Sequence, residues 1–121
     1  MNELITRISN ILYGKKAQKI VALDVSSLTV ITDCMLIASG RSTIQVKTLA
    51  EEVEDRLSEI GIEPVRKEGH RDGRWIVLDY NSVLVHIFHT EEREFYRLDR
   101  LWDDSANRIP LPFDAENEDD A

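Results

Sequence analysis

The stretch WIVLDYNSVLVHIFH, from Trp75 to His89, decides most of the fold. Two runs rich in β-branched and aromatic residues flank Tyr80, Asn81 and Ser82. Turn-forming residues between two such runs are typical of a β-hairpin. We therefore predict two antiparallel strands that are joined at these residues.

The predicted hairpin has two different faces, because side chains of a strand alternate between the two sides of a sheet. One face is almost purely apolar, which suits packing beneath helices; its residues are Ile76, Leu78, Tyr80, Val83, Val85 and Ile87. The other mixes large aromatic residues with an acid and a histidine; its residues are Trp75, Val77, Asp79, Leu84, His86 and Phe88. This mixed face fits a protein-binding surface with aromatic anchors. The alternative is that Trp75 and Phe88 pack beneath a loop.

The rest of the chain alternates between helical and strand patterns. Apolar residues recur at helical spacing over residues 4–12 and stop at Gly14. A second apolar stripe starts after Ser42, whose spacing to Gln45 fits a capping box, and ends at Gly61. The remaining expected elements are short strands at Ile20–Val25, Asp33–Ser39 and Glu63–Arg66 and a final helix capped by Thr90.

These elements predict the fold class. A chain of 121 residues with 42% hydrophobic content fits one small domain. The strands at residues 20–25 and 33–39 are continuous apolar runs, a pattern typical of strands that other structure covers. We expect a single α/β domain with a mixed sheet of about five strands and with the helices packed mainly on one face.

Composition argues against several classes of protein. The net charge is −8, and a general grip on nucleic-acid phosphates needs clustered lysine and arginine instead. No run approaches the ~20 apolar residues that span a bilayer. The single cysteine, Cys34, lies in an apolar run, so we expect it to be buried and reduced. We therefore expect a soluble, cytoplasmic protein without membrane contact and without direct sequence-specific binding to nucleic acid.

Negative charge is concentrated near the C-terminus. Residues 103–121 carry seven acids, one base and two of the three prolines. Such a composition buries too little apolar surface to offset the entropy of ordering the chain. We predict a folded domain over residues 1–106 and an acidic, disordered tail over residues 107–121.

Candidate catalytic and metal-binding groups are few. His86 and His89 on one extended strand point to opposite faces, so they share a metal ion only if the chain turns and His70 joins them. His86 and Asp79 could form an acid/base pair across the hairpin, but no activated Ser or Cys is identifiable beside them. We expect no metal and no cofactor.

The sequence ASGRS, from Ala38 to Ser42, leads from a strand through glycine into a helix. It could cradle a phosphate, as in nucleotidyltransferases, which also need an acidic pair on an adjoining strand to hold metal ions. The acids that follow fall on the second helix instead, where they fit a solvated face; they are Glu51, Glu52, Glu54 and Asp55. A nucleotide-binding or nucleotidyltransferase-like enzyme is therefore the alternative function.

Three blocks resemble the ribosomal silencing factor family of RsfS and Iojap-related proteins; they are LDVSSLTVITDCMLIASGRSTIQVK, WIVLDYNSVLVHIFH and EREFYRLDRLW. The resemblance covers about residues 4–102 and leaves the acidic tail outside. It implies a nucleotidyltransferase-like α/β fold without catalysis. It also implies binding to ribosomal protein fourteen of the large subunit, which blocks joining of the small subunit and represses translation when nutrients are scarce.

The resemblance places partner-binding residues on the hairpin and in the closing segment. Asn81 and Ser82 stand where many relatives have glycine and aspartate, which leaves the turn geometry open. An aromatic face that is exposed in the free protein could also be covered by a second copy in a homodimer. The residues that match the family's motifs are Trp75, Asp79, Tyr80, His86, Arg93, Phe95, Tyr96, Leu98 and Trp102.

Overall fold

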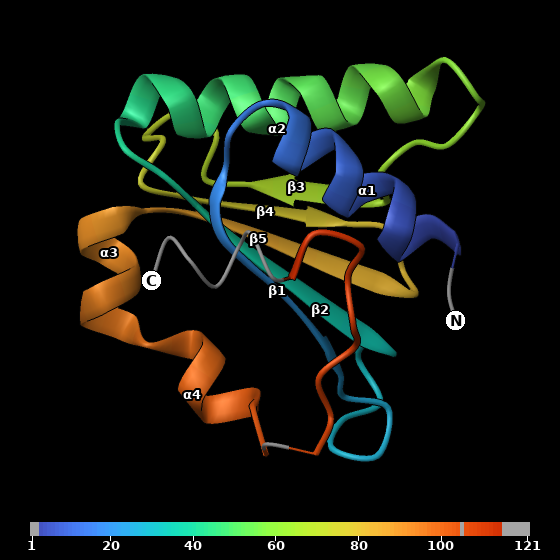
Figure 1. Cartoon of the computed structure of the whole chain (residues 1–121). Helices are drawn as coiled ribbons and strands as arrows, with labels where there is room; N and C mark the ends of the chain where they lie inside the picture. The colour runs from blue at the N-terminus through green and yellow to red at the C-terminus, as the bar shows by residue number, and fades with distance from the viewer. Residues whose placement is uncertain (1–2, 105, 115–121) are drawn as a thin grey trace.

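The computed structural model describes residues 3–104 and 106–114, without the side chains of residues 94–96, 98 and 99. Five strands form one sheet in the order β1-β2-β5-β4-β3 (Figure 1). The pair β2 and β5 is parallel and the other neighbouring pairs are antiparallel, so the sheet is mixed, as predicted. The strands are β1 (Gln18–Asp24), β2 (Cys34–Gly40), β3 (Arg66–Glu68), β4 (Trp75–Asp79) and β5 (Val83–His89).

Two long helices cover one face of this sheet. These helices, α1 (Glu3–Gly14) and α2 (Thr43–Ser58), lie together on one side of the strands in Figure 1. Two short helices, α3 (Thr90–Tyr96) and α4 (Leu98–Trp102), lie on the other side. The arrangement confirms the predicted single α/β domain with helices mainly on one face. None of the described helices is both long and apolar enough to cross a bilayer.

The hairpin has the two predicted faces. Its register pairs Trp75 with Phe88 and Leu78 with Val85. The apolar face packs into the main core beneath α1 and α2, and all of its predicted residues are buried there; they are Ile76, Leu78, Tyr80, Val83, Val85 and Ile87. The alternation of side chains along each strand is the physical reason that this face could be predicted.

The hairpin turn accommodates asparagine at the strained position. Asn81 has a φ of 74°, in the left-handed region that glycine and asparagine adopt most readily. Its backbone N–H donates to Asp79 Oδ1 at 2.9 Å, and the Tyr80 N–H donates to the Val83 carbonyl at 2.9 Å. Asparagine therefore serves here where many relatives were expected to have glycine.

The start of α2 matches the prediction. Ser42 is the N-cap, and its side-chain oxygen accepts from the Gln45 N–H at 3.0 Å. Gln45 Oε1 accepts from the Arg41 N–H at 2.6 Å, so both side chains satisfy backbone donors at the helix start. After the helix, Gly61 has a φ of 79°, which agrees with its predicted role in ending the helix.

Two predicted boundaries are wrong. Thr90 does not cap α3: it is the first helical residue, and its hydroxyl donates to the Gly40 carbonyl at 3.2 Å. His89 is the N-cap and provides no side-chain cap. The third strand begins at Arg66 rather than Glu63, because Pro64 has no N–H to offer the neighbouring strand.

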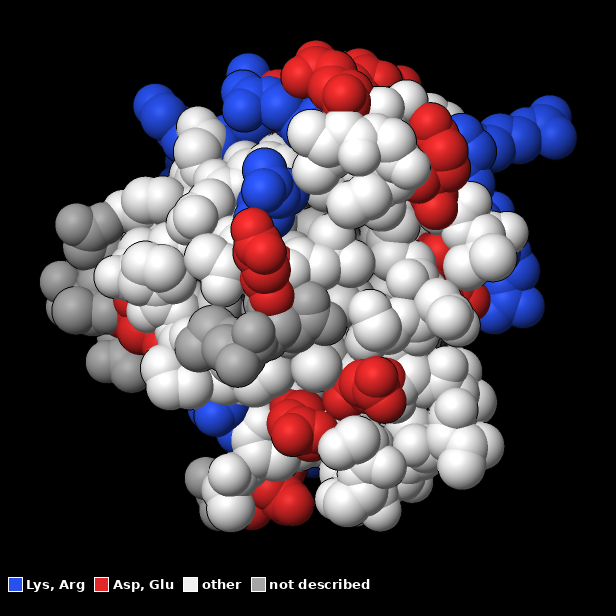
Figure 2. All heavy atoms as spheres, turned by 90° about the vertical axis from the view of Figure 1, so that its right-hand side faces the viewer, with Lys and Arg blue, Asp and Glu red and all other residues white. Residues whose placement is uncertain are grey.

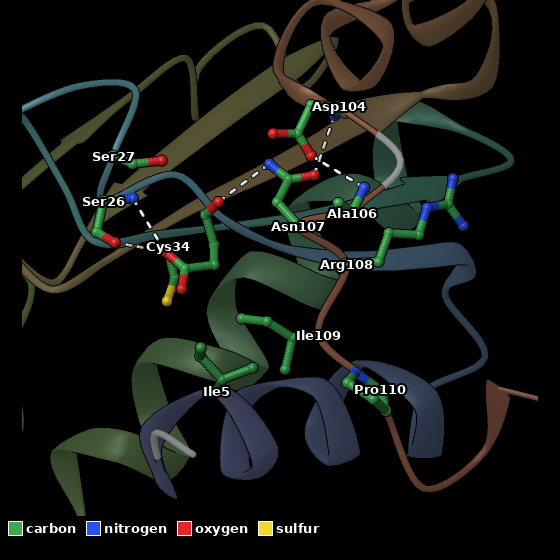
Figure 3. A pocket seen from close by; sticks show the side chains of 11 residues that line it. Ile5, Ser26, Ser27, Cys34, Asp104, Ala106, Asn107, Arg108, Ile109 and Pro110 are labelled. Carbon is green, nitrogen blue, oxygen red and sulfur yellow. Dashed lines mark hydrogen bonds between the residues drawn. The ribbon is translucent and has the colours of Figure 1, made fainter.

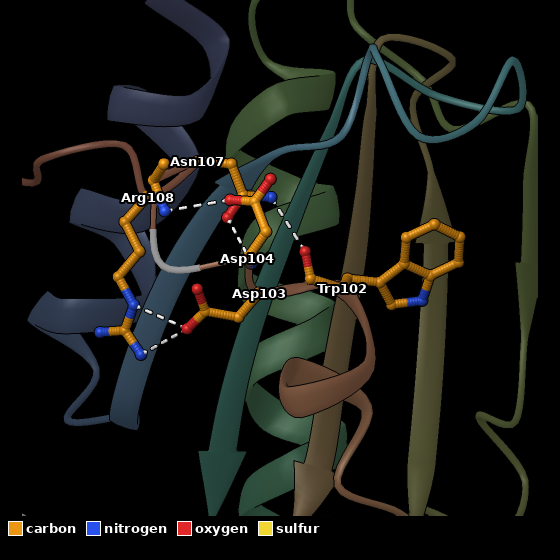
Figure 4. A network of polar contacts seen from close by, with 6 residues as sticks. Trp102, Asp103, Asp104, Asn107 and Arg108 are labelled. Carbon is orange, nitrogen blue, oxygen red and sulfur yellow. Dashed lines mark hydrogen bonds and ion pairs between the residues drawn. The ribbon is translucent and has the colours of Figure 1, made fainter.

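A second, smaller core lies on the other face of the sheet. It is formed by Leu23, Val25, Met35, Ile37 and Phe88, with Val21, Trp75, Leu84 and Trp102 packed against it. The α4 residue Trp102 covers part of this cluster, and its indole points toward the strands in Figure 4. Cys34 belongs to the main core and is a buried free thiol, as predicted. Burial raises the pKa of that thiol.

The prediction of disorder from Asn107 onward is wrong for residues 107–114. The Asn107 carbonyl accepts from the Asp24 N–H at 2.8 Å, and the Ile109 N–H donates to the Ala22 carbonyl at 2.8 Å. The main core includes Leu111 and Phe113, which are only 6% and 7% exposed. A composition averaged over the tail hid these apolar anchors. Residues 115–121 lie outside the described part of the chain.

A polar network fixes the start of this C-terminal segment (Figure 4). Asn107 Nδ2 donates to the Asp24 and Trp102 carbonyls at 3.0 and 2.9 Å, and Asn107 Oδ1 accepts from the Asp104 N–H at 3.0 Å. Asp103 forms an ion pair with Arg108 at 2.9 Å. Asn107 thus ties the end of α4 to the end of β1.

Candidate functional site

The mixed face of the hairpin is partly covered rather than open. Trp75, Val77, Asp79 and Leu84 are half-buried, whereas His86 is 5% exposed and Phe88 is fully buried. The expectation of a surface face is therefore wrong for His86 and Phe88, because the second core packs over the end of β5 at which they lie. The half-buried residues are those that remain available to a partner.

Trp75 lies at the centre of an aromatic group. Its ring stacks on Phe88 with centroids 4.8 Å apart, and its Nε1–H donates to His86 Nδ1 at 3.1 Å. The stack and the hydrogen bond hold the indole in one orientation, while part of the residue stays open to solvent. A large aromatic side chain that is already fixed loses little conformational freedom when a partner binds.

His86 supports Trp75 as a neutral imidazole. Burial lowers the pKa of His86 to about 4. Because Nδ1 accepts from Trp75, the remaining proton lies on Nε2, which has no hydrogen-bond partner within the described residues. His86 therefore positions the indole and stays uncharged at neutral pH.

Asp79 does not join His86. Its Oδ2 lies 3.6 Å from Arg66 Nη2, and its Oδ1 accepts from the Asn81 N–H. Asp79 pairs across the hairpin with Leu84, and His86 pairs with Val77, so the two side chains are offset along the strands. The hypothetical acid/base pair is thus not assembled.

Tyr80 and Arg93 are structural in their described contacts. Tyr80 is 7% exposed in the main core, and burial together with the negative charge of Glu54 raises the pKa of its hydroxyl. Arg93 is 8% exposed; its Nη1 donates to the Lys19 carbonyl at 2.6 Å and to Ser39 Oγ at 2.9 Å, which ties α3 to β1 and β2. The side chains of Phe95, Tyr96 and Leu98 lie outside the described part.

The histidines do not gather around a common point. His70 Nε2 lies 3.3 Å from Glu51 Oε2 on α2, whereas His86 packs with Trp75 on the opposite face of the sheet. Among the residues that the structure describes, no three His, Cys, Asp or Glu side chains are placed to hold a metal ion.

The start of α2 is occupied by its own caps rather than open to a phosphate. The Gln45 N–H donates to Ser42 Oγ, and the Arg41 N–H donates to Gln45 Oε1. A Cβ atom at Gly40 would lie 3.0 Å from Val46 Cγ2, so glycine here permits close packing of helix on strand. The ASGRS motif is explained by helix capping and packing.

A cleft of about 580 Å³ lies between the β1–β2 loop, the C-terminal segment and α1 (Figure 3). Its acids are Asp24 and Asp104. Asp24 accepts from the N–H and hydroxyl of Ser26, which lowers the pKa of its carboxyl group. Asp24 pairs with Cys34, the first residue of β2, whereas Gly40 is the last. The acids and the ASGRS motif therefore lie at opposite ends of β2.

A family model described as ribosomal silencing factor during starvation matches residues 1–121. The chain belongs to the ribosomal silencing factor family. The match extends beyond residues 4–102, where the sequence resemblance was expected to end, and includes the acidic C-terminal residues.

Relatives within the ribosomal silencing factor family are similar over most of the chain. A ribosomal silencing factor RsfS of Halalkalibacterium halodurans is 40% identical over 103 residues, which are 85% of this chain and 88% of that protein. The chloroplastic protein Iojap of Zea mays is 30% identical over 103 residues, which are 85% of this chain and 44% of that protein.

Crystal structures also match the fold. A protein from Chromobacterium violaceum has a TM-score of 0.81 at 34% identity, covering 91% of both chains. A protein from Bacillus halodurans has a TM-score of 0.79 at 37% identity, covering 90% of this chain and 98% of the other. The mixed sheet described above is therefore shared with solved structures.

Sequence reasoning missed an exposed apolar group on the loop between β1 and β2. Leu28, Val30 and Ile31 are 47%, 102% and 68% exposed. Residues 20–40 contain no lysine or arginine, and the lower part of the face in Figure 2 carries mainly neutral and acidic side chains. The three residues lie within four positions, too short a stretch for periodicity to give a signal.

Proposed function

We propose that this protein represses translation by binding ribosomal protein fourteen of the large ribosomal subunit and blocking the small subunit from joining. The observation that carries the proposal is the match of the whole chain to a family described as ribosomal silencing factors during starvation. The role belongs to the cytoplasm, where ribosomal subunits join, and to conditions of nutrient limitation.

The geometry of the hairpin supports a docking role. Trp75 is half-buried on a rigid base of Phe88 and His86, beside the half-buried Val77 and Leu84. Binding energy at protein interfaces concentrates on such aromatic anchors, with surrounding residues that exclude water. We infer that Trp75 anchors the partner and that Asp79 contributes from the other end of β4. The buried Tyr80, His86 and Arg93 then act by shaping this surface.

Steric occlusion needs no catalysis. The alternative, a nucleotide-binding enzyme, is disfavoured because the acids of the cleft and the start of α2 lie at opposite ends of β2. A nucleotide at 100 times its dissociation constant would stabilise the folded state by about 2.7 kcal/mol. We expect no rise in melting temperature with nucleotide and magnesium or manganese; a clear rise would revive the enzyme hypothesis.

Co-sedimentation with isolated ribosomal subunits tests the proposal. We expect the protein to pellet with large subunits only and to reduce the joining of small subunits in a sucrose gradient. Equal pelleting with both subunits, or with neither, would count against the role.

Two variants then separate the faces of the hairpin. Trp75→Ala should weaken large-subunit binding by about 2 kcal/mol, roughly thirtyfold, because a hot-spot contact is lost. Leu78→Ala should instead cost about 2 to 5 kcal/mol of stability while the folded fraction still binds, because Leu78 is fully buried in the main core. Trp75→Phe keeps an aromatic ring over Phe88 and controls for lost packing. Normal binding by folded Trp75→Ala would remove Trp75 from the interface.

A further inference from the structure

Several cations without acidic partners gather at one end of the sheet. This end lies at the left of Figure 1, where β2 and β5 finish, α2 and α3 begin and the loop before β4 lies. Within the described residues, none of these cations lies within 4.0 Å of a carboxylate oxygen. All are exposed except the half-buried Lys47; they are Lys16, Lys19, Arg41, Lys47 and Arg71, called here the basic end.

Side-chain contacts hold the segments of the basic end together. Gln45 Nε2 donates to the Lys16 carbonyl at 3.3 Å, which joins α2 to the turn after α1. When the Gln18 amide is oriented with its oxygen toward Arg41, that oxygen accepts from Arg41 Nη2 and Nε at 2.9 Å each, which joins β1 to the start of α2. Lys19 follows Gln18 directly, so its position is fixed by the same contacts.

The loop before β4 is seated on the same helix. Gly73 is buried and has a φ of 74°; a Cβ atom there would lie 2.8 Å from Lys47 Cε and 3.0 Å from the Thr43 carbonyl oxygen. The Gly73 N–H donates to the Gly69 carbonyl at 3.0 Å, which closes the loop. Arg71 lies on this loop, two residues before the glycine that packs against Lys47.

The backbone at Lys16 and Lys19 is unfavourable for lysine. Their φ angles are 66° and 49°, in the left-handed region where glycine and asparagine fit better. Side chains that persist in strained backbone tend to serve a function rather than the fold. Both lysines lie on the basic end, which makes them candidates for a role in binding.

The basic end adjoins the proposed protein-binding surface. Arg74 precedes Trp75, and its carbonyl accepts from the His89 N–H at 2.8 Å. Nearby acids are the exposed Asp72 and Glu91, whereas Glu92 is neutralised by Arg74 at 3.1 Å. A ligand of the basic end would therefore lie next to a protein bound at Trp75.

We propose that the basic end binds backbone phosphates of large-subunit ribosomal RNA beside the docked ribosomal protein. The proposal rests on the function proposed above. Lysine and arginine without acidic partners on several segments match the spaced single charges of an RNA backbone, and such contacts carry no sequence specificity. The net charge of −8 conceals this local clustering.

Salt dependence of binding to isolated large subunits tests the inference. For the full chain, the logarithm of the binding constant should fall linearly with the logarithm of salt concentration, by about 0.7 to 0.9 per phosphate contact. The triple variant Lys16→Gln, Lys19→Gln, Lys47→Gln should lower that slope by about 2. An unchanged slope would overturn the inference. It would also be overturned if an acidic peptide competed with large subunits for the protein while free large-subunit RNA did not.

A matched control keeps the change in net charge equal. Arg7, Arg56 and Lys67 each form an ion pair with a glutamate away from the basic end. Their triple change to Gln should leave the salt slope within experimental error. Equal loss of slope in both triple variants would show that only net charge matters and would refute a local phosphate site.

A second readout separates binding from folding. Lys16→Asn places a residue suited to the left-handed backbone, so its melting temperature should be no lower than that of the parent chain, while large-subunit binding weakens. A drop in melting temperature with unchanged binding would contradict the role of Lys16. If the parent chain fails to pellet with large subunits at all, the proposed function fails; if it pellets with an unchanged slope in the variants, only the phosphate site fails.

Discussion

The docking of the C-terminal segment makes a prediction about Phe113. Its ring is 7% exposed and stacks on Tyr13 of α1, with centroids 4.2 Å apart and planes at 9°. Truncating Phe113 should therefore destabilise the fold, although Asp114 follows it and the residues beyond are mostly polar or acidic. The acidic composition of residues 103–121 alone predicts no such effect.

The magnitude follows from how the segment is held. Replacing a buried Phe by Ala typically costs about 3 to 5 kcal/mol. If the segment detaches from α1 and β1 while the rest stays folded, the loss cannot exceed the free energy of docking. We therefore expect Phe113→Ala to lower the free energy of unfolding by about 1 to 3 kcal/mol, which is at or below the lower end of the range for a buried Phe.

Urea unfolding of a double-mutant cycle measures this contact. Tyr13→Ala, Phe113→Ala and the double variant should give a coupling free energy of about 0.5 to 1.5 kcal/mol, the usual size for a stacked aromatic pair. Pro112→Ala is the control: Pro112 is exposed between the two buried anchors, so its change should cost less than about 1 kcal/mol. If Phe113→Ala unfolds at the parent urea midpoint and the cycle shows no coupling, residues 107–114 do not dock in solution.

Two further predictions concern the support of Trp75. The pKa of His86 is lowered to about 4 by burial, from an unfolded value of 6.5, so the unfolded state binds more protons between these values. The contribution of His86 to the free energy of unfolding should be fully present above about pH 6.5 and should be lost as the pH falls toward about 4. In urea titrations, His86→Gln should flatten this pH dependence. An equal effect of His70→Gln would contradict the assignment to His86. Gly69→Ala should lower stability by about 1 to 3 kcal/mol or more, because Gly69 has a φ of 81° and a Cβ atom would lie 1.9 Å from the Trp75 carbonyl oxygen. Gly14→Ala meets nothing within 4 Å and should be neutral or stabilising, so equal thermal unfolding of the two variants would disprove the clash.

The predictable parts of the fold are those that local pattern determines. Alternation along Trp75–His89 gave both faces of the hairpin, and the Ser42–Gln45 spacing gave the start of α2. Local pattern does not say what covers a face. Phe88 and His86 could be assigned to the mixed face, but their burial depends on the second core that packs over it.

The C-terminal segment shows why composition misled. Its average charge indicated disorder, whereas docking depends on Leu111 and Phe113 and on hydrogen bonds with β1. The candidate site was only partly predictable. Trp75 could be identified from its residue type and its face of the strand, but its fixed orientation arises from contacts with residues distant in sequence. Lys16 and Lys19 could not be found, because positive φ angles leave no mark in the residue type.

The C-terminal segment also changes what one outer border of the sheet can do. An outer strand presents unpaired N–H and C=O groups that can recruit another chain and start aggregation. On β1 some of these groups are taken by residues 107–109, through the Leu23–Arg108 bridge and the bonds that flank it. The opposite outer strand, β3, has only three residues, and all of them are charged and exposed. Loss of the C-terminal segment would therefore expose the unpaired N–H and C=O groups of β1. A truncated chain should then self-associate through β1 before it unfolds.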